Sequence, residues 1–279
     1  MSINNFIPEI WAAQLLQSNE RNLVFGALAN RDYNGVIAKA GDTVRITSIG
    51  APTVATYIPN VTVIVPEELT DAQMLLTVTE SKYFAFKIDN VDRSQALPGV
   101  MDEALRQAGY KLRDIADRFV ASFYTGVAAA NALGVVAVTT PALAFDQLNK
   151  LMVKLDEADI PSEGRWVVAP PWYCGLLTLD ARVTNLESLG PEALVNGRVL
   201  RAQGFDIHKS NNCVNPTGDD WIVMAGTNAA ISFVEQIPPD GVVAYKPESS
   251  FSDAVKGLHL YGAKLVRPDG IATLQASIT

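Results

Sequence analysis

The chain has 279 residues, and its 30 acidic side chains outnumber 22 basic ones, which gives a net charge of −8 at pH 7. This balance excludes broad binding of nucleic-acid phosphates, which requires clustered lysine and arginine. Only 19% of the residues are charged and 48% are hydrophobic, whereas roughly 25% charged residues is typical of a soluble domain. This composition excludes a disordered chain and suggests that other chains cover part of the apolar surface.

No segment of the sequence predicts export or membrane insertion. The first residues, MSINNFIPEIW, lack the basic and apolar regions of a signal peptide. Cys174 and Cys213 are too few for a disulfide framework and are interpreted as reduced thiols of a cytoplasmic product. The uncharged stretch 119–145 is long enough to span a bilayer, but glycines and Pro141 interrupt it. We therefore expect a buried core segment there.

Residues 1–40 are predicted to form an arm rather than a domain. Trp11, Leu15, Leu16 and Phe25 are apolar, and so short a segment cannot bury them by itself. These side chains must dock either on another part of this chain or on a neighbouring chain.

Residues 41–93 predict an extended β-hairpin. Val44 and Ile46 alternate with polar residues, a turn is expected near Pro66, and the return pass 74–89 alternates again. A free hairpin is marginally stable in water, so we expect it to lie over a partner.

Between about residues 98 and 123, the spacing of the apolar side chains changes from that of a strand to that of a helix. One apolar stripe comprises Met101, Leu105, Ala108, Leu112, Ile115, Phe119 and Phe123. The other face offers three i,i+4 ion pairs: Asp102 with Arg106, Arg113 with Asp117, and Asp114 with Arg118. The result would be an unusually long helix with a buried face and a charged face.

The C-terminal half predicts a mixture of helices and strands. A helix begins at Thr140 and Pro141, because threonine is a good cap and proline suits the first helical turn. Strands are expected at 166–169, 205–208, 221–225 and 255–266, and a turn entering a short helix at 226–231. The fold class is therefore α+β.

The residues needed for catalysis or for metal binding are missing. His208 and His259 are the only histidines and are expected in exposed loops or at strand edges. A zinc site needs three or four ligands at compatible spacing, and His208 with Cys213 provides two at most. Cys174 lies in an apolar run and is interpreted as a core residue, and there is no glycine-rich phosphate loop or nucleophile elbow. We expect no enzyme activity, cofactor or metal.

Several segments, in this order along the chain, resemble the major capsid proteins of tailed bacteriophages, which have the Hong Kong 97 fold. The segments are IPEIW at 7–11, NRDY at 30–33, GDTV at 41–44, GFDIHKSNN at 204–212, AGTNAAI at 225–231 and KGLHLYGAK at 256–264.

The resemblance implies a domain organisation. It consists of an N-terminal arm (1–40), an extended β-hairpin loop (41–93), a spine helix with a peripheral domain (94–184 with the tail 246–279) and an axial domain (185–245). It also implies a structural protein that assembles into the hexamers and pentamers of an icosahedral head enclosing double-stranded DNA. A separate scaffolding protein and a portal are implied as partners, with assembly in the host bacterial cytoplasm.

Candidate contacts between subunits follow from the arm and the loop. They are the apolar Trp11, Leu15, Leu16 and Phe25 and the charged Arg45, Glu67, Glu68 and Asp71. Some family members link subunits covalently through a lysine of this loop, but no lysine occurs between Asp42 and Ser81, so the region near the expected loop tip lacks the necessary amine. A shell held by non-covalent contacts is expected. The alternatives are an encapsulin-like nanocompartment shell and, more remotely, a hydrolase with an unrecognised site.

Overall fold

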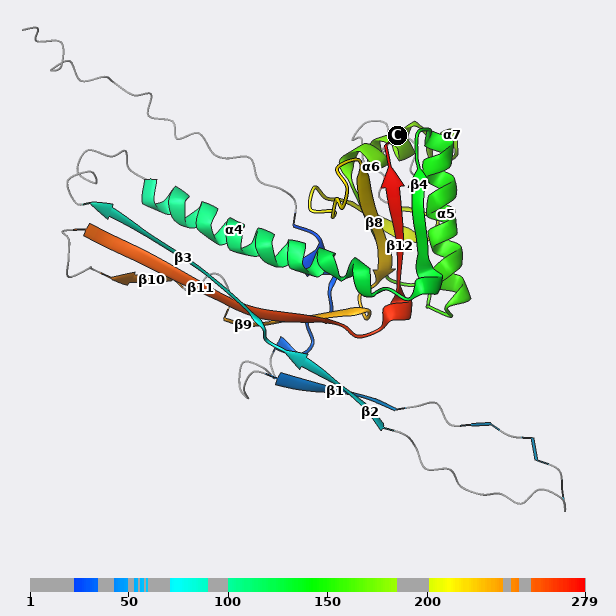
Figure 1. Ribbon diagram of the computed structural model, residues 1–279, viewed down its shortest axis with the longest axis horizontal. Helices are drawn as coiled ribbons and strands as arrows, with labels where there is room; N and C mark the ends of the chain where they lie inside the picture. The colour runs from blue at the N-terminus through cyan, green and yellow to red at the C-terminus, as the bar shows by residue number, and fades with distance from the viewer. Residues whose placement is uncertain are drawn as a thin grey trace, which may run out of the picture.

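The computed structural model shows an α+β fold in which a long helix and a long sheet extend from a more compact body (Figure 1). It describes residues 23–34, 43–49, 53–54, 56–57, 59, 71–89, 100–184, 201–237, 242–245 and 252–278.

The body is built on a six-stranded sheet with the order β4-β12-β8-β5-β7-β6. The strands are β4 (Ala132–Ala137), β12 (Ile271–Ser277), β8 (Asp220–Thr227), β5 (Arg165–Ala169), β7 (Phe205–Lys209) and β6 (Arg201–Ala202). The β12–β4 and β5–β7 pairs are parallel, and the other pairs are antiparallel.

Three helices accompany this sheet, namely α5 (Pro141–Glu157), α6 (Pro171–Leu179) and α7 (Ala181–Thr184). The predicted cap of α5 is confirmed, because the Thr140 hydroxyl accepts a hydrogen bond from the backbone N–H of Leu143 at 3.3 Å. Leu148, Leu151 and Leu155 of α5 are fully buried in the body core, as expected from their helical spacing.

A second sheet lies beside the long helix α4 (Val100–Ala121) (Figure 1). In this sheet β11 (Ser252–Leu265) pairs with β10 (Val242–Tyr245), with β3 (Glu80–Asp89) and, near its C-terminal end, with β9 (Ile231–Ile237). The predicted long helix is therefore confirmed, and β11 is the strand that all the others of this sheet share.

A separate two-stranded ladder projects from the molecule (Figure 1). It pairs β1 (Thr43–Ile49) with β2 (Asp71–Thr77) in antiparallel register. The short helices are α1 (Phe25–Leu28) and the 3₁₀ turns η2 (Ser122–Gly126), η3 (Ala129–Asn131) and η4 (Pro268–Gly270).

The prediction of one uninterrupted return strand in the hairpin is wrong. The chain leaves the ladder after Thr77 and continues as β3, which pairs with β11 over ten residues. Gly262 of β11 lies at this break, where a Cβ atom would come within 2.3 Å of the Thr77 carbonyl oxygen. The close crossing requires glycine, and β11 offers β3 a longer partner than β1 could.

The predicted domain boundary near residue 185 is also wrong. Strand β5, from before that boundary, pairs with both β7 and β8, from after it. All five residues of β5 are buried, so the strand needs neighbours on both sides to satisfy its backbone. The two regions therefore form one sheet.

The short helix predicted after residue 226 is a strand instead. Residues 228–230 form a turn that leads from β8 of the body sheet into β9 of the second sheet, where Ile231 and Phe233 are buried. Pairing of β9 with β11 outweighs the weak helical preference of the alanines.

The uncharged stretch 119–145 includes the end of α4, two 3₁₀ turns, β4 and the beginning of α5. Among the described residues, no helix is long and apolar enough to cross a membrane. The expectation of a fully buried segment is wrong for β4, because this edge strand exposes four of its six residues.

The buried face of α4 differs from the predicted stripe in the middle of the helix. Leu112 is 3% exposed, but Ile115 is 42% exposed, and Ala116 takes part in the core instead. The small side chain of Ala116 allows α1 to pack against the helix. The predicted pair of Asp114 and Arg118 is confirmed, with 2.7 Å between its carboxylate and guanidinium atoms.

We predict that Leu112→Ala lowers the free energy of unfolding of the unassembled subunit by about 2–5 kcal/mol, because it leaves a cavity under α4. Ile115→Ala is the matched control, and it should cost less than about 1 kcal/mol because its side chain already contacts water. Urea unfolding followed by circular dichroism measures both. Equal losses would contradict this orientation of α4.

Candidate assembly interface

One carboxylate joins three parts of the molecule. Asp117 of α4 accepts a hydrogen bond from the backbone N–H of Gly26 at 2.9 Å, which caps α1, since Val24 offers no side-chain cap. Its other oxygen accepts from the amide nitrogen of Asn212 at 2.9 Å, in the loop after β7. The same amide nitrogen also donates to Asp114 at 2.8 Å. The N-terminal segment and the body are thus both attached to the long helix.

Asp117 is only 2% exposed, and desolvation raises the pKa of its carboxyl group. Hydrogen bonds from Gly26 and Asn212 act in the opposite direction, and the neighbouring Asp114 charge raises the pKa further. Asp117, which was predicted to pair with Arg113 on the exposed face of the helix, is therefore a buried hydrogen-bond acceptor. The prediction of an exposed pair at Asp117 is wrong, because α1 and the loop after β7 cover this side of the helix.

The N-terminal segment also extends the sheet at β9. The backbone N–H of Asn30 donates to Ile231 and its carbonyl oxygen accepts from Phe233, both at 2.8 Å. Two strand-like bonds hold this segment, and the Asn34 side chain accepts a third from the backbone of Glu235 at 3.1 Å.

A buried histidine continues this attachment into β11. The Nε2 atom of His259 lies 3.0 Å from a carboxylate oxygen of Glu235, whose other oxygen is 3.1 Å from the Arg31 guanidinium. These partners lower the pKa of Glu235, His259 first. The expectation that His259 is exposed is wrong, since it is fully buried between strands and faces a carboxylate of β9.

The base of the projecting ladder packs on the same region. Val44, Ile46 and Leu76 form a small core with Val234 of β9, and Tyr33 of the N-terminal segment packs against it. The base of the ladder is therefore attached to β9, the same strand that binds the N-terminal segment at Asn30 and Asn34.

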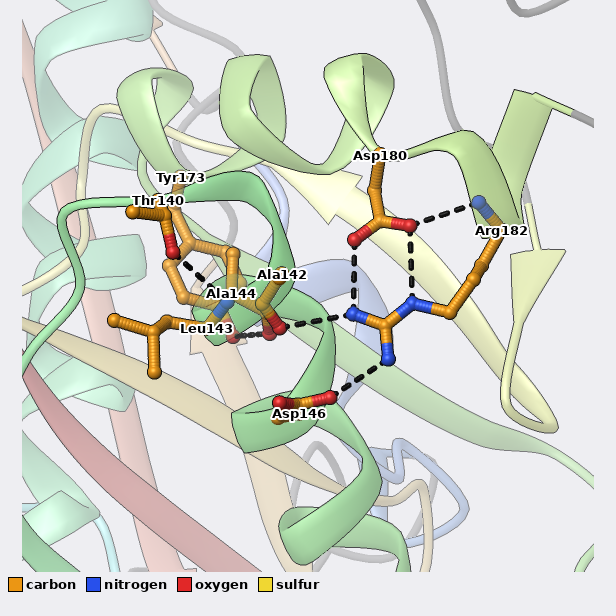
Figure 2. Close-up of polar contacts among 8 residues, drawn as sticks. All are labelled: Thr140, Ala142, Leu143, Ala144, Asp146, Tyr173, Asp180 and Arg182. Atoms are coloured by element: carbon orange, nitrogen blue, oxygen red, sulfur yellow. Dashed lines mark hydrogen bonds and ion pairs between the residues drawn. The ribbon is translucent and has the colours of Figure 1, made fainter.

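A different network braces the far end of the body (Figure 2). The Arg182 guanidinium lies 2.9 Å from Asp180 and 2.8 Å from Asp146, and it donates to the Ala142 carbonyl oxygen at 3.0 Å. It also covers the Phe145 ring, 4.3 Å from the centroid. Arg182 lowers the pKa of Asp180. These contacts fix the beginning of α5 against α7.

Apolar side chains are exposed on the parts that project. Val54, between the two ladder strands, is 94% exposed, and Tyr83 of β3 is 77% exposed. The sheet face that carries Tyr83 forms an apolar groove of about 680 Å³. Tyr83, Ala85, Ile237, Val243, Lys256, Gly257 and Leu258 line this groove. Surfaces of this kind are typical of contacts between proteins.

Neither cysteine has the surroundings of a catalytic nucleophile. Burial raises the pKa of the Cys174 thiol to about 11 and also raises that of Cys213, so both are poor nucleophiles at neutral pH. Across the ranges that the structure describes, no three His, Cys, Asp or Glu side chains are grouped to hold a metal ion.

The predicted contact residues lie in different surroundings. Phe25 is buried within its own chain against α4, so its side chain is not available to a neighbour. Arg45 is exposed on β1, and Asp71 begins β2 opposite Ile49. The remaining candidates fall outside the described residues; they are Trp11, Leu15, Leu16, Glu67 and Glu68.

Comparison with known proteins gives a consistent result. The family described as phage capsid protein matches residues 71–274. A solved structure from Mycobacterium phage Che8 has 31% sequence identity and a TM-score of 0.84, covering 98% of both chains. The capsid structure of cyanophage P-SCSP1u has 16% identity and a TM-score of 0.79, covering 100% of this chain and 95% of the other.

A third structure, the asymmetric unit of the bacteriophage PhiM1 mature capsid, has 16% identity and a TM-score of 0.75, covering 97% and 92% of the two chains. No curated protein sequence matches significantly.

The elongated α+β fold and its projecting ladder define a structural protein that builds a shell. The chain belongs to the phage capsid protein family. It is a major capsid protein with the predicted Hong Kong 97 fold, and the encapsulin alternative is not favoured.

We predict that Asp117→Asn changes the pH dependence of subunit stability. The folded-state pKa of Asp117 is raised above the unfolded value of about 4, so between these two pKa values the folded subunit binds more protons. The stability of the wild-type subunit should therefore fall relative to Asp117→Asn as the pH rises through this window. Urea unfolding at several pH values measures the difference, and a difference independent of pH would contradict the prediction. Asp117→Ala, which leaves the donors of Gly26 and Asn212 unpaired, should lower the free energy of unfolding by about 1–3 kcal/mol.

Proposed function

We propose that this chain forms the hexamers and pentamers of an icosahedral phage head that encloses double-stranded DNA. The observation that carries the proposal is the projecting β1–β2 ladder, whose connecting segment exposes Val54 and Tyr57 to water. A two-stranded ladder is marginally stable alone, and exposed apolar side chains gain free energy when a neighbour covers them. Overlap between subunits provides that cover.

The proposed partners follow from this role. A separate scaffolding protein and a portal direct assembly in the host bacterial cytoplasm, and the DNA is enclosed without sequence-specific contacts. The net charge of −8 supports weak interaction with DNA, because a strongly basic wall would hinder packing and release. The protein catalyses no reaction in this scheme.

The contacts between subunits are proposed to come from the arm (1–40) and the loop (41–93). Within the arm, Trp11, Leu15 and Leu16 are the apolar anchors. Within the loop, Arg45, Glu67, Glu68 and Asp71 pair with charges of a neighbour. Phe25 is left out, since its side chain is already buried within its own subunit.

Electron microscopy of the chain produced in bacteria, with and without the phage's scaffolding gene, tests the proposal. Closed shells of uniform diameter are expected in at least one of the two preparations. A monodisperse monomer in both would contradict it.

We predict that deleting residues 1–22 leaves a folded subunit that fails to close shells. The cut preserves Val24 and Phe25, which belong to the core beneath α4, so folding should survive. Trp11, Leu15 and Leu16 are lost, and fully burying each is worth about 1.5–3 kcal/mol. Circular dichroism checks the fold and microscopy checks the shells. Normal shells would show that the arm is dispensable.

We also predict that the mature shell contains no covalent links between subunits. The loop has no lysine between Asp42 and Ser81, and Arg45 stays protonated, so it is a poor nucleophile. Particles boiled in detergent and reductant should give one band near 30 kDa. Acid should loosen the particles as loop carboxylates such as Glu67 become protonated. A ladder of higher bands after boiling would contradict the prediction.

A further inference from the structure

His259 is a titratable side chain at the place where the N-terminal segment 23–34 is attached to β9. Its ring is fully buried, and its Nε2 atom lies 3.0 Å from Oε1 of Glu235. Because an ionised carboxylate only accepts hydrogen bonds, Nε2 carries a proton and donates it to this contact. The other ring nitrogen, Nδ1, is buried without a hydrogen-bond partner among the described residues. A second proton on the ring would therefore place a donor in the interior without an acceptor.

The carboxylate of Glu235 is shared between the histidine and the N-terminal segment. Its Oε2 atom lies 3.1 Å from Nη1 of Arg31. The Nε atom of Arg31 donates to the Gly26 carbonyl oxygen at 3.1 Å, and the guanidinium lies 5.1 Å from the centroid of the Phe233 ring. Arg31 therefore links the N-terminal segment to β9 through both a charge and an aromatic ring.

The other titratable groups around His259 add little net charge. Lys82 lies opposite His259 on β3 and forms an ion pair with Glu80 at 2.9 Å. The ring of Tyr261, on the same strand as His259, lies 4.5 Å from the imidazole, and burial raises the pKa of Tyr261 to about 12, so it stays neutral. On α4, Asp117 already accepts the hydrogen bonds described above. His259 therefore interacts most directly with the charge of Glu235.

Arginines already balance the charge of Glu235. His259, Arg31 and, from α4, Arg113 lower the pKa of Glu235, His259 first, so this carboxylate stays charged in mild acid. A proton on His259 would bring a third positive charge to one negative charge. Arg31 is the partner that can move into water, because its side chain is 45% exposed, whereas His259 is enclosed.

We propose that His259 is a pH-sensitive switch for the N-terminal segment, in which the protonated imidazole displaces Arg31 from Glu235 and loosens residues 23–34 from β9. Histidine ordinarily changes its charge between about pH 5 and pH 8. The segment is then held more firmly at neutral pH than in mild acid. Because protonation favours the loosened segment, loosening must favour protonation by the same factor.

The switch concerns a single subunit and does not depend on the proposed function. The arm at 1–22, which is proposed to contact neighbours, continues directly into this segment. If both proposals hold, the proton also changes how firmly the arm is attached to its own subunit.

Hydrogen exchange of the unassembled subunit at about pH 7.5 and about pH 5.5 tests the switch. The amides of Asn30 and Phe233 report on the segment, because each donates one of the hydrogen bonds that join it to β9. After correction for the intrinsic exchange rate, their protection should fall roughly tenfold in acid. Equal protection at the two pH values would overturn the proposal.

A substitution of the histidine assigns the effect. His259→Gln keeps an N–H donor for Glu235 but cannot gain a proton, so it should abolish the fall in protection. His208→Gln on β7 is the matched control and should retain the fall. Because Asp117 titrates in all three proteins, comparison at the same pH removes its contribution. A fall of equal size in His259→Gln would overturn the proposal.

The reverse coupling can be measured even if His259→Gln does not fold. In Arg31→Met, the competition for Glu235 is removed, so the nuclear magnetic resonance signal of the His259 ring should show a roughly tenfold higher proton affinity than in the wild type. The His208 signal, identified by its absence in His208→Gln, should be unchanged. Equal titration of His259 in both proteins would overturn the switch. Neither measurement uses shells, so a failure of the proposed function would be seen separately, by microscopy.

Discussion

The buried carboxylate of Asp117 is the constraint on which the arrangement of the subunit depends. It provides the cap that α1 lacks, and it holds Asn212 of the body against the long helix. Burying a carboxylate is costly unless hydrogen bonds compensate, and here donors from two other elements do so. The three parts cannot separate without leaving this group unpaired. This residue and the apolar core around it therefore hold the N-terminal segment, the long helix and the body together.

Strand β11 connects these parts along the length of the molecule. It pairs with β3 and β10 over its first part and with β9 over its last, and η4 then leads into β12 in the body. The N-terminal segment is attached to β9, and the base of the ladder packs on Val234 of that strand. The N-terminal segment from Asn30 to Asn34 and the base of the ladder are thus both attached to the sheet that leads through β11 into the body.

Elements with a strong local signal were predictable from the sequence. The threonine and proline at the beginning of α5 and the apolar spacing of Leu148, Leu151 and Leu155 both correspond to the structure. The partners of each strand were not predictable, because pairing depends on residues far apart in the chain. The alternation in β3 is the same whether it pairs with β1 or with β11. Asp117 and His259 were missed for a similar reason: no periodicity shows that a charged or polar residue will be covered by another element.

The ladder is joined to the second sheet at a short crossing over Gly262. Only Val78 and Thr79 separate β2 from β3, and the chain passes so close to β11 there that a side chain would not fit. Each ladder strand has seven residues and is about 23 Å long. A tilt of the ladder by about 10° at this crossing would therefore displace the far end of the ladder by about 4 Å. A tilt that preserved the packing of Val44, Ile46 and Leu76 on Val234 would change the reach of the ladder while the rest of the subunit kept its shape.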